Sequence, residues 1–66
     1  MTAKQRVEVE LVELKAKLES LSKLLQCDKP DFISDIQWEL MIEQEFHMLE
    51  YAHILEERLK EWLKEW

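Results

Sequence analysis

The sequence lacks glycine altogether and contains one proline, Pro30, and one cysteine, Cys27, in 66 residues. Glycine and proline dominate the tight turns that connect strands, so their scarcity argues against a sheet. A single cysteine cannot form a disulfide within the chain, and one free thiol is typical of a reducing cytoplasm. Leucine, glutamate and lysine are abundant, as they are in long helices. The composition therefore predicts an all-α protein.

Long apolar runs are also missing. No run approaches the roughly 20 residues of a membrane-spanning helix, and residues 1–6 lead into no hydrophobic signal segment. We therefore expect a cytoplasmic protein without a membrane partner. Residues 31–57 hold eight carboxylates and no lysine or arginine, and the chain has a net charge of −6. Because such a field repels a phosphate backbone, we expect no nucleic-acid polymer as a partner.

The beginning of the chain has the pattern of a helix start. Thr2 and Gln5 have the spacing of a capping box, which predicts a helix over residues 3–26. Its apolar residues recur at alternating steps of four and three, typical of a helix that packs lengthwise against another. They are Val7, Leu11, Leu14, Leu18, Leu21 and Leu25. Val9, Val12 and Leu24 lie off this line and form a second, weaker apolar face.

A turn is expected over residues 27–34, because Pro30 disfavours helical geometry in the residue before it. Ser34 is suited to cap the following helix, with Gln37 three residues later, and Ile33 and Trp38 have the spacing of a hydrophobic staple. The second helix should then span residues 35–66. These two helices predict an antiparallel hairpin that forms a single domain over residues 1–66.

The second helix is apolar around most of its circumference. One line holds Trp38, Met41, Met48, Ala52, Leu55, Leu59, Trp62 and Trp66, interrupted by Glu45; a second holds Ile42, Phe46, Leu49 and Leu63; a third holds Leu40, Tyr51 and Ile54. A single partner helix cannot cover three lines, and a chain this short buries only about 60% of its unfolded surface. We therefore predict a homo-oligomeric helical bundle. The expected oligomer interface comprises Leu11, Leu18, Trp38, Met48, Leu55, Leu59, Trp62 and Trp66.

The C-terminal end contains an LKEW repeat over residues 59–66. If the chain folds back near Pro30 so that Leu25 lies opposite residue 37, about eight residues of the second helix project past the first. Trp62 and Trp66 would form an apolar tip there. We expect this tip to support self-association. The alternative is an adaptor that binds another protein through the tip, and a membrane-surface anchor is less favoured because lysine and glutamate balance there.

Residues that suggest catalysis are scarce. The sequence has no nucleophile elbow, glycine-rich phosphate loop or Ser/His/Asp grouping, so we expect no enzyme. Glu50 and His53 form a Glu-x-x-His, the spacing used by di-iron bundles. The same spacing arises by chance in a helix so rich in glutamate, so we expect no metal and no cofactor.

Basic residues gather at the two ends of the chain. In the predicted hairpin, Lys4 and Arg6 lie across from residues 56–58, close to Arg58 and to the free N–H groups that begin the first helix. Cations at a helix N-terminus favour phosphate or another anion. The alternative is that Arg6 and Arg58 form ordinary ion pairs with nearby glutamates.

Residues 39–59 contain the frame L-x3-Q-x3-M-x2-Y-x2-IL-x2-R. The frame resembles a family of short phage and prophage proteins first catalogued in crAss-like phages, which also place a Leu/Glu/Lys-rich helix before a turn. Its specific positions are Gln44, Met48, Tyr51, Leu55 and Arg58, which follow one helical line. The LKEW repeat is not part of the family pattern.

The resemblance implies a phage-encoded accessory protein that works in the host cytoplasm. In the adaptor alternative, the C-terminal tip with Trp62 and Trp66 would bind a host or phage protein. Small helical phage proteins of this sort include anti-defence sponges, which oligomerise and trap nucleotide-derived immune signals of the host. The resemblance implies a cyclic nucleotide or an ADP-ribose-derived small molecule as ligand. Its expected binding residues are Lys4, Arg6, Gln44, Tyr51 and Arg58: the tyrosine would stack on a base, the glutamine would hydrogen-bond a polar edge, and the cations would hold phosphate.

Overall fold

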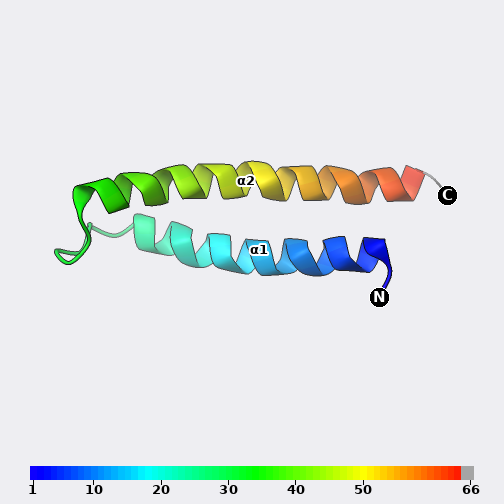
Figure 1. Ribbon diagram of the computed structural model, residues 1–66, viewed down its shortest axis with the longest axis horizontal. Coiled ribbons are helices and arrows are strands. Elements are labelled where there is room, and N and C mark those ends of the chain that lie inside the picture. Colours follow the sequence, from blue (N-terminus) through cyan, green and yellow to red (C-terminus); the bar gives the residue numbers. More distant parts are fainter. Residues whose placement is uncertain (65–66) are drawn as a thin grey trace.

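The chain folds into two antiparallel helices in a computed structural model that describes residues 1–64, with side chains described through residue 62. Helix α1 spans Ala3–Leu25 and helix α2 spans Asp35–Lys64. The two lie side by side along their length, and the start of α1 and the last turns of α2 are at the same end of the molecule (Figure 1). The all-α fold and the packing of two helices against each other are thereby confirmed.

The start of α1 is stabilised by the predicted capping box. The backbone N–H of Gln5 donates to Thr2 Oγ1 at 3.1 Å, and the Gln5 side-chain oxygen accepts from the backbone N–H of Thr2 at 2.9 Å. Two N–H groups that a helix start would leave unpaired are therefore satisfied.

The nine-residue connection 26–34 is held by a lysine and a serine. Lys29 Nζ donates to the backbone oxygen of Ile33 at 2.7 Å and lies 3.5 Å from the carboxylate of Asp35. The backbone N–H of Gln37 donates to Ser34 Oγ at 3.1 Å, so Ser34 caps α2 as the sequence predicted.

The contact between α1 and α2 is a seam of residues at steps of three and four, as the sequence predicted. Its buried members are Val7, Leu11, Leu18, Ala52 and Leu55. Four of them, all except Leu18, form one cluster, against which Leu14, Leu59 and Trp62 pack. Leu55 is the most deeply enclosed, with 0% of its surface exposed. This cluster lies in the half of the hairpin away from the turn.

The register of the two helices differs from the expected one. Lys15 Nζ lies 2.9 Å from a carboxylate oxygen of Glu56, and Ser22 Oγ donates to Glu45 at 2.6 Å. The prediction that Leu25 lies opposite residue 37 is therefore wrong. The connection 26–34 does not reverse tightly: α2 begins beyond the last turn of α1 (Figure 1).

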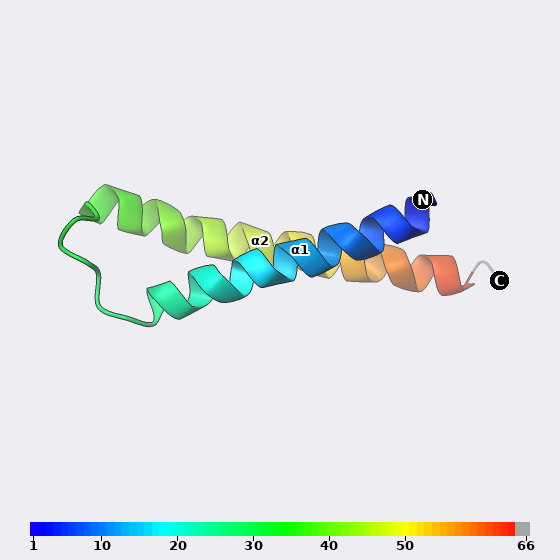
Figure 2. The ribbon, with the colours of Figure 1, turned by 90° about the horizontal axis from the view of Figure 1, so that it is seen from below.

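The extra length of α2 consequently extends past α1 at both ends rather than forming an eight-residue tip at one (Figure 1). The helices also cross at an angle and separate toward the turn (Figure 2). Seam residues near the turn are only half-buried: Leu21, Leu25, Trp38, Met41 and Glu45.

Candidate functional site

Three of the predicted ligand-binding residues share one edge of α2. Gln44, Tyr51 and Arg58 each precede a seam residue and are spaced by seven, which sets them about 10.5 Å apart along the helix. All three are exposed, and Tyr51 exposes 43% of its surface. We call these three residues the Tyr51 edge. Met48 and Leu55, the other two specific positions of the frame, belong to the seam; Met48 is half-buried and Leu55 is buried.

Arg58 is positioned by an aromatic ring. Its Cζ atom lies 5.8 Å from the centroid of the Trp62 ring, a distance at which a guanidinium is attracted to the face of an indole. Trp62 itself packs against the core cluster. The Arg58 cation is therefore held at the surface beside the seam.

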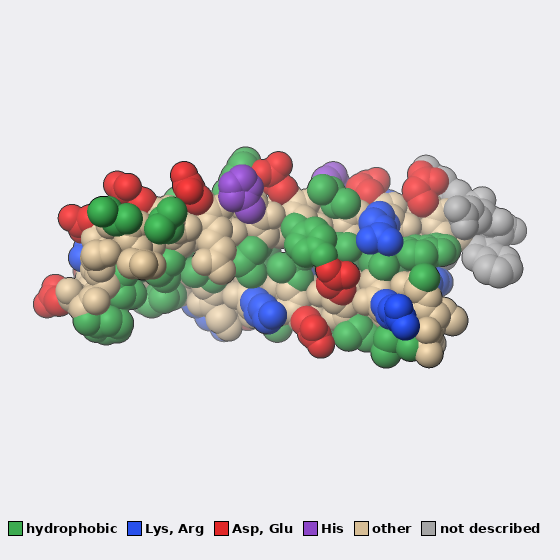
Figure 3. Space-filling view, viewed as in Figure 1, with side chains coloured by type: hydrophobic (Ala, Val, Ile, Leu, Met, Phe, Trp, Pro, Cys, Tyr) green, Lys and Arg blue, Asp and Glu red, His purple; other side chains and the backbone are tan. Residues whose placement is uncertain are grey.

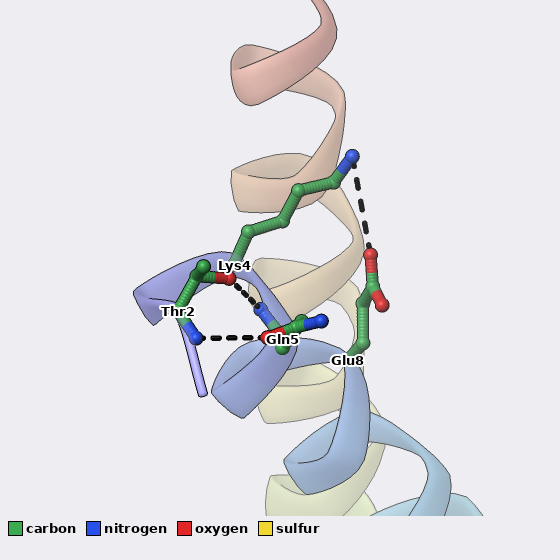
Figure 4. Close-up of polar contacts among 4 residues, drawn as sticks. All are labelled: Thr2, Lys4, Gln5 and Glu8. Atoms are coloured by element: carbon green, nitrogen blue, oxygen red, sulfur yellow. Dashed lines mark hydrogen bonds and ion pairs between the residues drawn. The ribbon is translucent and has the colours of Figure 1, made fainter.

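The other two predicted cations, Lys4 and Arg6, lie at the start of α1. Lys4 Nζ approaches a Glu8 carboxylate oxygen at 4.0 Å, the limit for an ion pair, and its side chain reaches toward Glu8 beside the capping box (Figure 4). Arg6 is exposed. Both residues belong to the first turns of α1, which lie at the same end of the molecule as the last turns of α2 (Figure 1).

A cation that the sequence reasoning missed, Lys17, lies on the Tyr51 edge. Lys15 and Glu56 each follow a seam residue and meet on the opposite edge. Lys17, like Tyr51, precedes a seam residue, and in this register it lies close to the level of Tyr51. Among the residues whose side chains are described, Lys17 has no ion-pair partner. The sequence places Lys17 one residue before the seam residue Leu18. That position indicates a place near Tyr51 only when the register of the two helices is known.

On the opposite edge of α2, an ion pair joins the two helices. The Lys15 ammonium donates a hydrogen bond to Glu56 and attracts its charge, which lowers the pKa of the Glu56 carboxyl below its usual value of 4.5. Both side chains are about half exposed, so the pair is screened by water and contributes little to stability. The two edges of α2 thus differ: one carries a satisfied pair and the other carries cations, an amide and a phenol.

The residues expected to bind a second copy are used largely within one chain. Leu11, Leu18 and Leu55 are buried between α1 and α2, and a residue buried there is not available to a partner. Trp38, Met48, Leu59 and Trp62 are half-buried on the same seam. Trp66 lies outside the described residues.

The exposed apolar side chains lie instead on the lines that flank the seam. They include Val9, Val12, Leu24, Leu40, Ile42, Phe46, Leu49, Tyr51 and Ile54. In space-filling view, hydrophobic side chains follow the boundary between the helices, and acidic side chains line the outer side of α2 (Figure 3). The second apolar face of α1 and the additional lines of α2 are therefore present on the surface.

Within the described part of the chain there is no group of three or more metal-binding side chains, and no helix long and apolar enough to cross a membrane. His47 Nδ1 lies 3.6 Å from Glu50 on the exposed surface of α2. Glu50 therefore pairs with His47, on the same turn of the helix.

A family model described as Sequestin matches residues 1–61. The chain belongs to the Sequestin family. Neither the curated proteins nor the solved structures contained a match. The family match includes the whole Tyr51 edge and Lys17 but ends before Trp62, so the C-terminal tryptophans of this Sequestin lie outside it. The family name is consistent with a sequestering function and specifies no ligand.

Proposed function

We propose that this Sequestin is a phage-encoded accessory protein that works in the host cytoplasm as a homo-oligomer and sequesters a nucleotide-derived immune signal. The observation that carries the proposal is the Tyr51 edge: a phenol, an amide and a guanidinium at regular spacing on the surface of a chain from a family named for sequestration. Each group matches one part of a nucleotide.

The chemistry of recognition follows from these groups. The Tyr51 ring would stack on a base, as aromatic rings do in single-stranded nucleic-acid sites. Gln44 would donate to and accept from a polar base edge. Arg58 would hold a phosphate through its fork of N–H donors, with Lys17 as a second cation on the same edge.

A homo-oligomer is part of the proposal because one edge of a helix encloses little of a ligand. Pockets that retain small molecules bury most of the ligand surface. A neighbouring copy would therefore cover the Tyr51 edge, and Lys4 and Arg6 of that copy are the cations that we expect it to supply. A small anion held by several cations tolerates the overall net charge of −6, whereas a long polyanion would be repelled.

We propose binding without chemical conversion, since no described side chains form a nucleophile, a metal centre or an acid–base pair around the Tyr51 edge. The host signal would be withdrawn from its receptor and kept intact. The alternative of an adaptor that docks through a tryptophan tip loses support, because Trp62 packs against the core cluster.

The proposal is tested by thermal unfolding of the purified protein with a panel of cyclic dinucleotides and cyclic ADP-ribose isomers. A ligand at 100 times its Kd stabilises the folded state by about 2.7 kcal/mol. For a domain of this size, that corresponds to a rise in Tm of roughly 10 °C or more.

Tyr51→Ala should abolish the rise in Tm. The matched control is Ile54→Ala, which removes an apolar side chain of similar exposure, 55%, from the same side of α2. It should keep the rise. If no compound of the panel raises the Tm, or if both variants lose the rise equally, the proposed site is contradicted.

A further inference from the structure

The indole ring of Trp62 lies against the guanidinium of Arg58. Trp62 follows Arg58 by four residues in α2, and a helical side chain leans toward the start of its helix, over the preceding turn. The Arg58 Cζ atom lies over the ring, 5.8 Å from its centroid. Trp62 is half-buried and packs against the core cluster. The core therefore fixes the ring, and the ring fixes the cation.

The ion pair on the opposite edge of α2 indicates which other contact is available to Arg58. Residues that flank the seam of two packed helices commonly form ion pairs across it, as Lys15 and Glu56 do at 2.9 Å. On the Tyr51 edge the equivalent acid is Glu10, which is half-buried, precedes a seam residue and in this register lies close to the level of Arg58. Among the residues whose side chains are described, neither Glu10 nor Arg58 takes part in an ion pair. Arg58 thus lies over the ring although a carboxylate is at its level.

The two possible contacts of Arg58 differ in what they leave to a ligand. At a hydrated surface, a cation over an indole ring and an ion pair are similar in strength, and salt weakens the ion pair further. A carboxylate neutralises the guanidinium and occupies two of its N–H donors, whereas the face of a ring leaves those donors unoccupied. Arg58 over Trp62 therefore keeps both its charge and its fork of N–H donors for an anion.

We propose that Trp62 is a positioning residue for anion binding: it holds Arg58 over its ring and away from Glu10, so that the guanidinium donors remain available to a phosphate group. This inference deepens the proposed function and rests on its assignment of Arg58 to phosphate. A guanidinium that is already held in one place loses less conformational freedom when an anion binds, which strengthens binding. The family match ends at residue 61, so the residue that positions Arg58 lies outside it.

NMR of the ligand-free protein tests the contact between the two side chains. The chain has two arginines, and Arg6 is exposed at the start of α1, so its side-chain Nε–Hε signal is an internal reference. The Arg58 Nε–Hε signal should lie upfield of it because of the ring current of Trp62. Trp62→Leu keeps an apolar side chain against the core and should remove this shift. Trp38→Leu, the same substitution at the half-buried tryptophan near the turn, should leave the shift unchanged.

Inorganic pyrophosphate, which carries phosphate groups without a base, tests anion binding at Arg58. Its Kd is measured from the shifts of the backbone amide signals around residue 58 during a titration. Trp62→Leu should raise this Kd roughly fivefold. Trp62→Phe keeps a ring and should raise the Kd less, and Trp38→Leu should not change it. Arg58→Ala should raise the Kd at least as much as Trp62→Leu does.

Removal of the competing carboxylate separates positioning from packing. In the native background, Glu10→Gln should lower the Kd of pyrophosphate slightly, because one negative charge near the anion is lost. In the Trp62→Leu background the same substitution should lower the Kd several-fold more, because it also releases Arg58 from Glu10. If Trp62 only packs against the core, Glu10→Gln should have the same effect in both backgrounds.

Four results would overturn the inference: an Arg58 signal that Trp62→Leu does not move, no binding of pyrophosphate by the native protein, equal affinity of the native protein and Trp62→Leu, or equal effects of Glu10→Gln in the two backgrounds. The nucleotide proposal can fail separately. If pyrophosphate binding depends on Arg58 and Trp62 while no compound of the nucleotide panel binds, the nucleotide proposal is contradicted and the positioning role of Trp62 is supported.

Discussion

The two halves of the hairpin follow the same pattern of seam residues but are packed differently. Away from the turn, Val7, Leu11, Ala52 and Leu55 form a buried cluster. Near the turn, the seam residues are half-buried, and a serine–carboxylate hydrogen bond joins the helices at Ser22. The helices lie closer together in the half away from the turn and separate toward the turn (Figure 2).

This difference indicates which half of the hairpin one chain packs fully and which half it leaves partly exposed. The half away from the turn has a core of its own and holds both helices in register. The half near the turn leaves Phe32 and Ile36 exposed by 88% and 71%, and it also contains the exposed side chains of Ile42 and Phe46. A second copy would therefore contribute most to the half that one chain packs least.

The largest expected effect is at Leu55, which has 0% exposure. Leu55→Ala should lower the free energy of unfolding by about 2–5 kcal/mol, because it removes buried methyl groups and leaves a cavity. Met41→Ala, at a half-buried seam position near the turn, should cost about half as much or less. Urea unfolding at one protein concentration measures both. Equal costs would mean that the two halves contribute equally to stability.

A substitution near the turn should raise the free energy of unfolding instead of lowering it. Glu45 occupies a half-buried seam position and accepts a hydrogen bond from Ser22 at 2.6 Å. Glu45→Leu should raise the free energy of unfolding by about 1 kcal/mol, since it adds apolar contact and leaves only a partly hydrated hydroxyl without its partner. A loss of stability in the same unfolding experiment would show that the hydrogen bond contributes more than apolar packing at this level.

The two helix starts offer a smaller comparison. Thr2 takes part in a reciprocal capping box at the end away from the turn, and Ser34 accepts one backbone hydrogen bond at the turn. Thr2→Ala should cost about 1 kcal/mol of unfolding free energy. Each substitution removes the acceptor of one backbone N–H, but only at Thr2 is that bond part of a reciprocal pair completed by the Gln5 side chain, so Ser34→Ala should cost somewhat less. A larger cost for Ser34→Ala would indicate that the turn half depends on its cap more than its packing suggests.

The smallest expected effect is on the pH dependence of stability. The pKa of Glu56 is lowered in the folded state by the hydrogen bond and charge of Lys15. A lowered folded-state pKa adds stability above the unfolded value, near 4.5, and the gain is lost as the pH falls through the folded-state pKa. Lys15→Met should therefore make stability fall slightly less on acidification below about pH 5. Parallel pH profiles for the native protein and the variant would contradict this assignment.

Much of the fold could be predicted from periodicity alone. The steps of four and three identified the seam, and Thr2 and Ser34 marked the helix starts, because capping and apolar spacing are local properties of the sequence. The register could not be predicted, because it depends on the path of residues 26–34 and on side-chain pairs such as Lys15–Glu56. That error produced the expected eight-residue tip.

The candidate site was predictable to a similar extent. Gln44, Tyr51 and Arg58 were placed on one line by their spacing within a helix, which requires no knowledge of the partner helix. Lys17 was missed, because its position near Tyr51 depends on the register. Exposure of Ile42, Phe46 and Leu49 was implied by the second apolar line, but their separation from the Tyr51 edge became clear only when Lys15 and Glu56 defined the two sides of α2.

The most direct measurement of sequestration is a recovery assay. Each compound of the nucleotide panel is incubated with excess protein, the free fraction is collected by ultrafiltration, and the protein is then denatured and filtered again, with chromatography of both filtrates. The account predicts that one compound disappears from the first filtrate and returns chemically unaltered in the second. If every compound stays in the first filtrate, or if the retained one returns as a different molecule, the proposed sequestering function is contradicted.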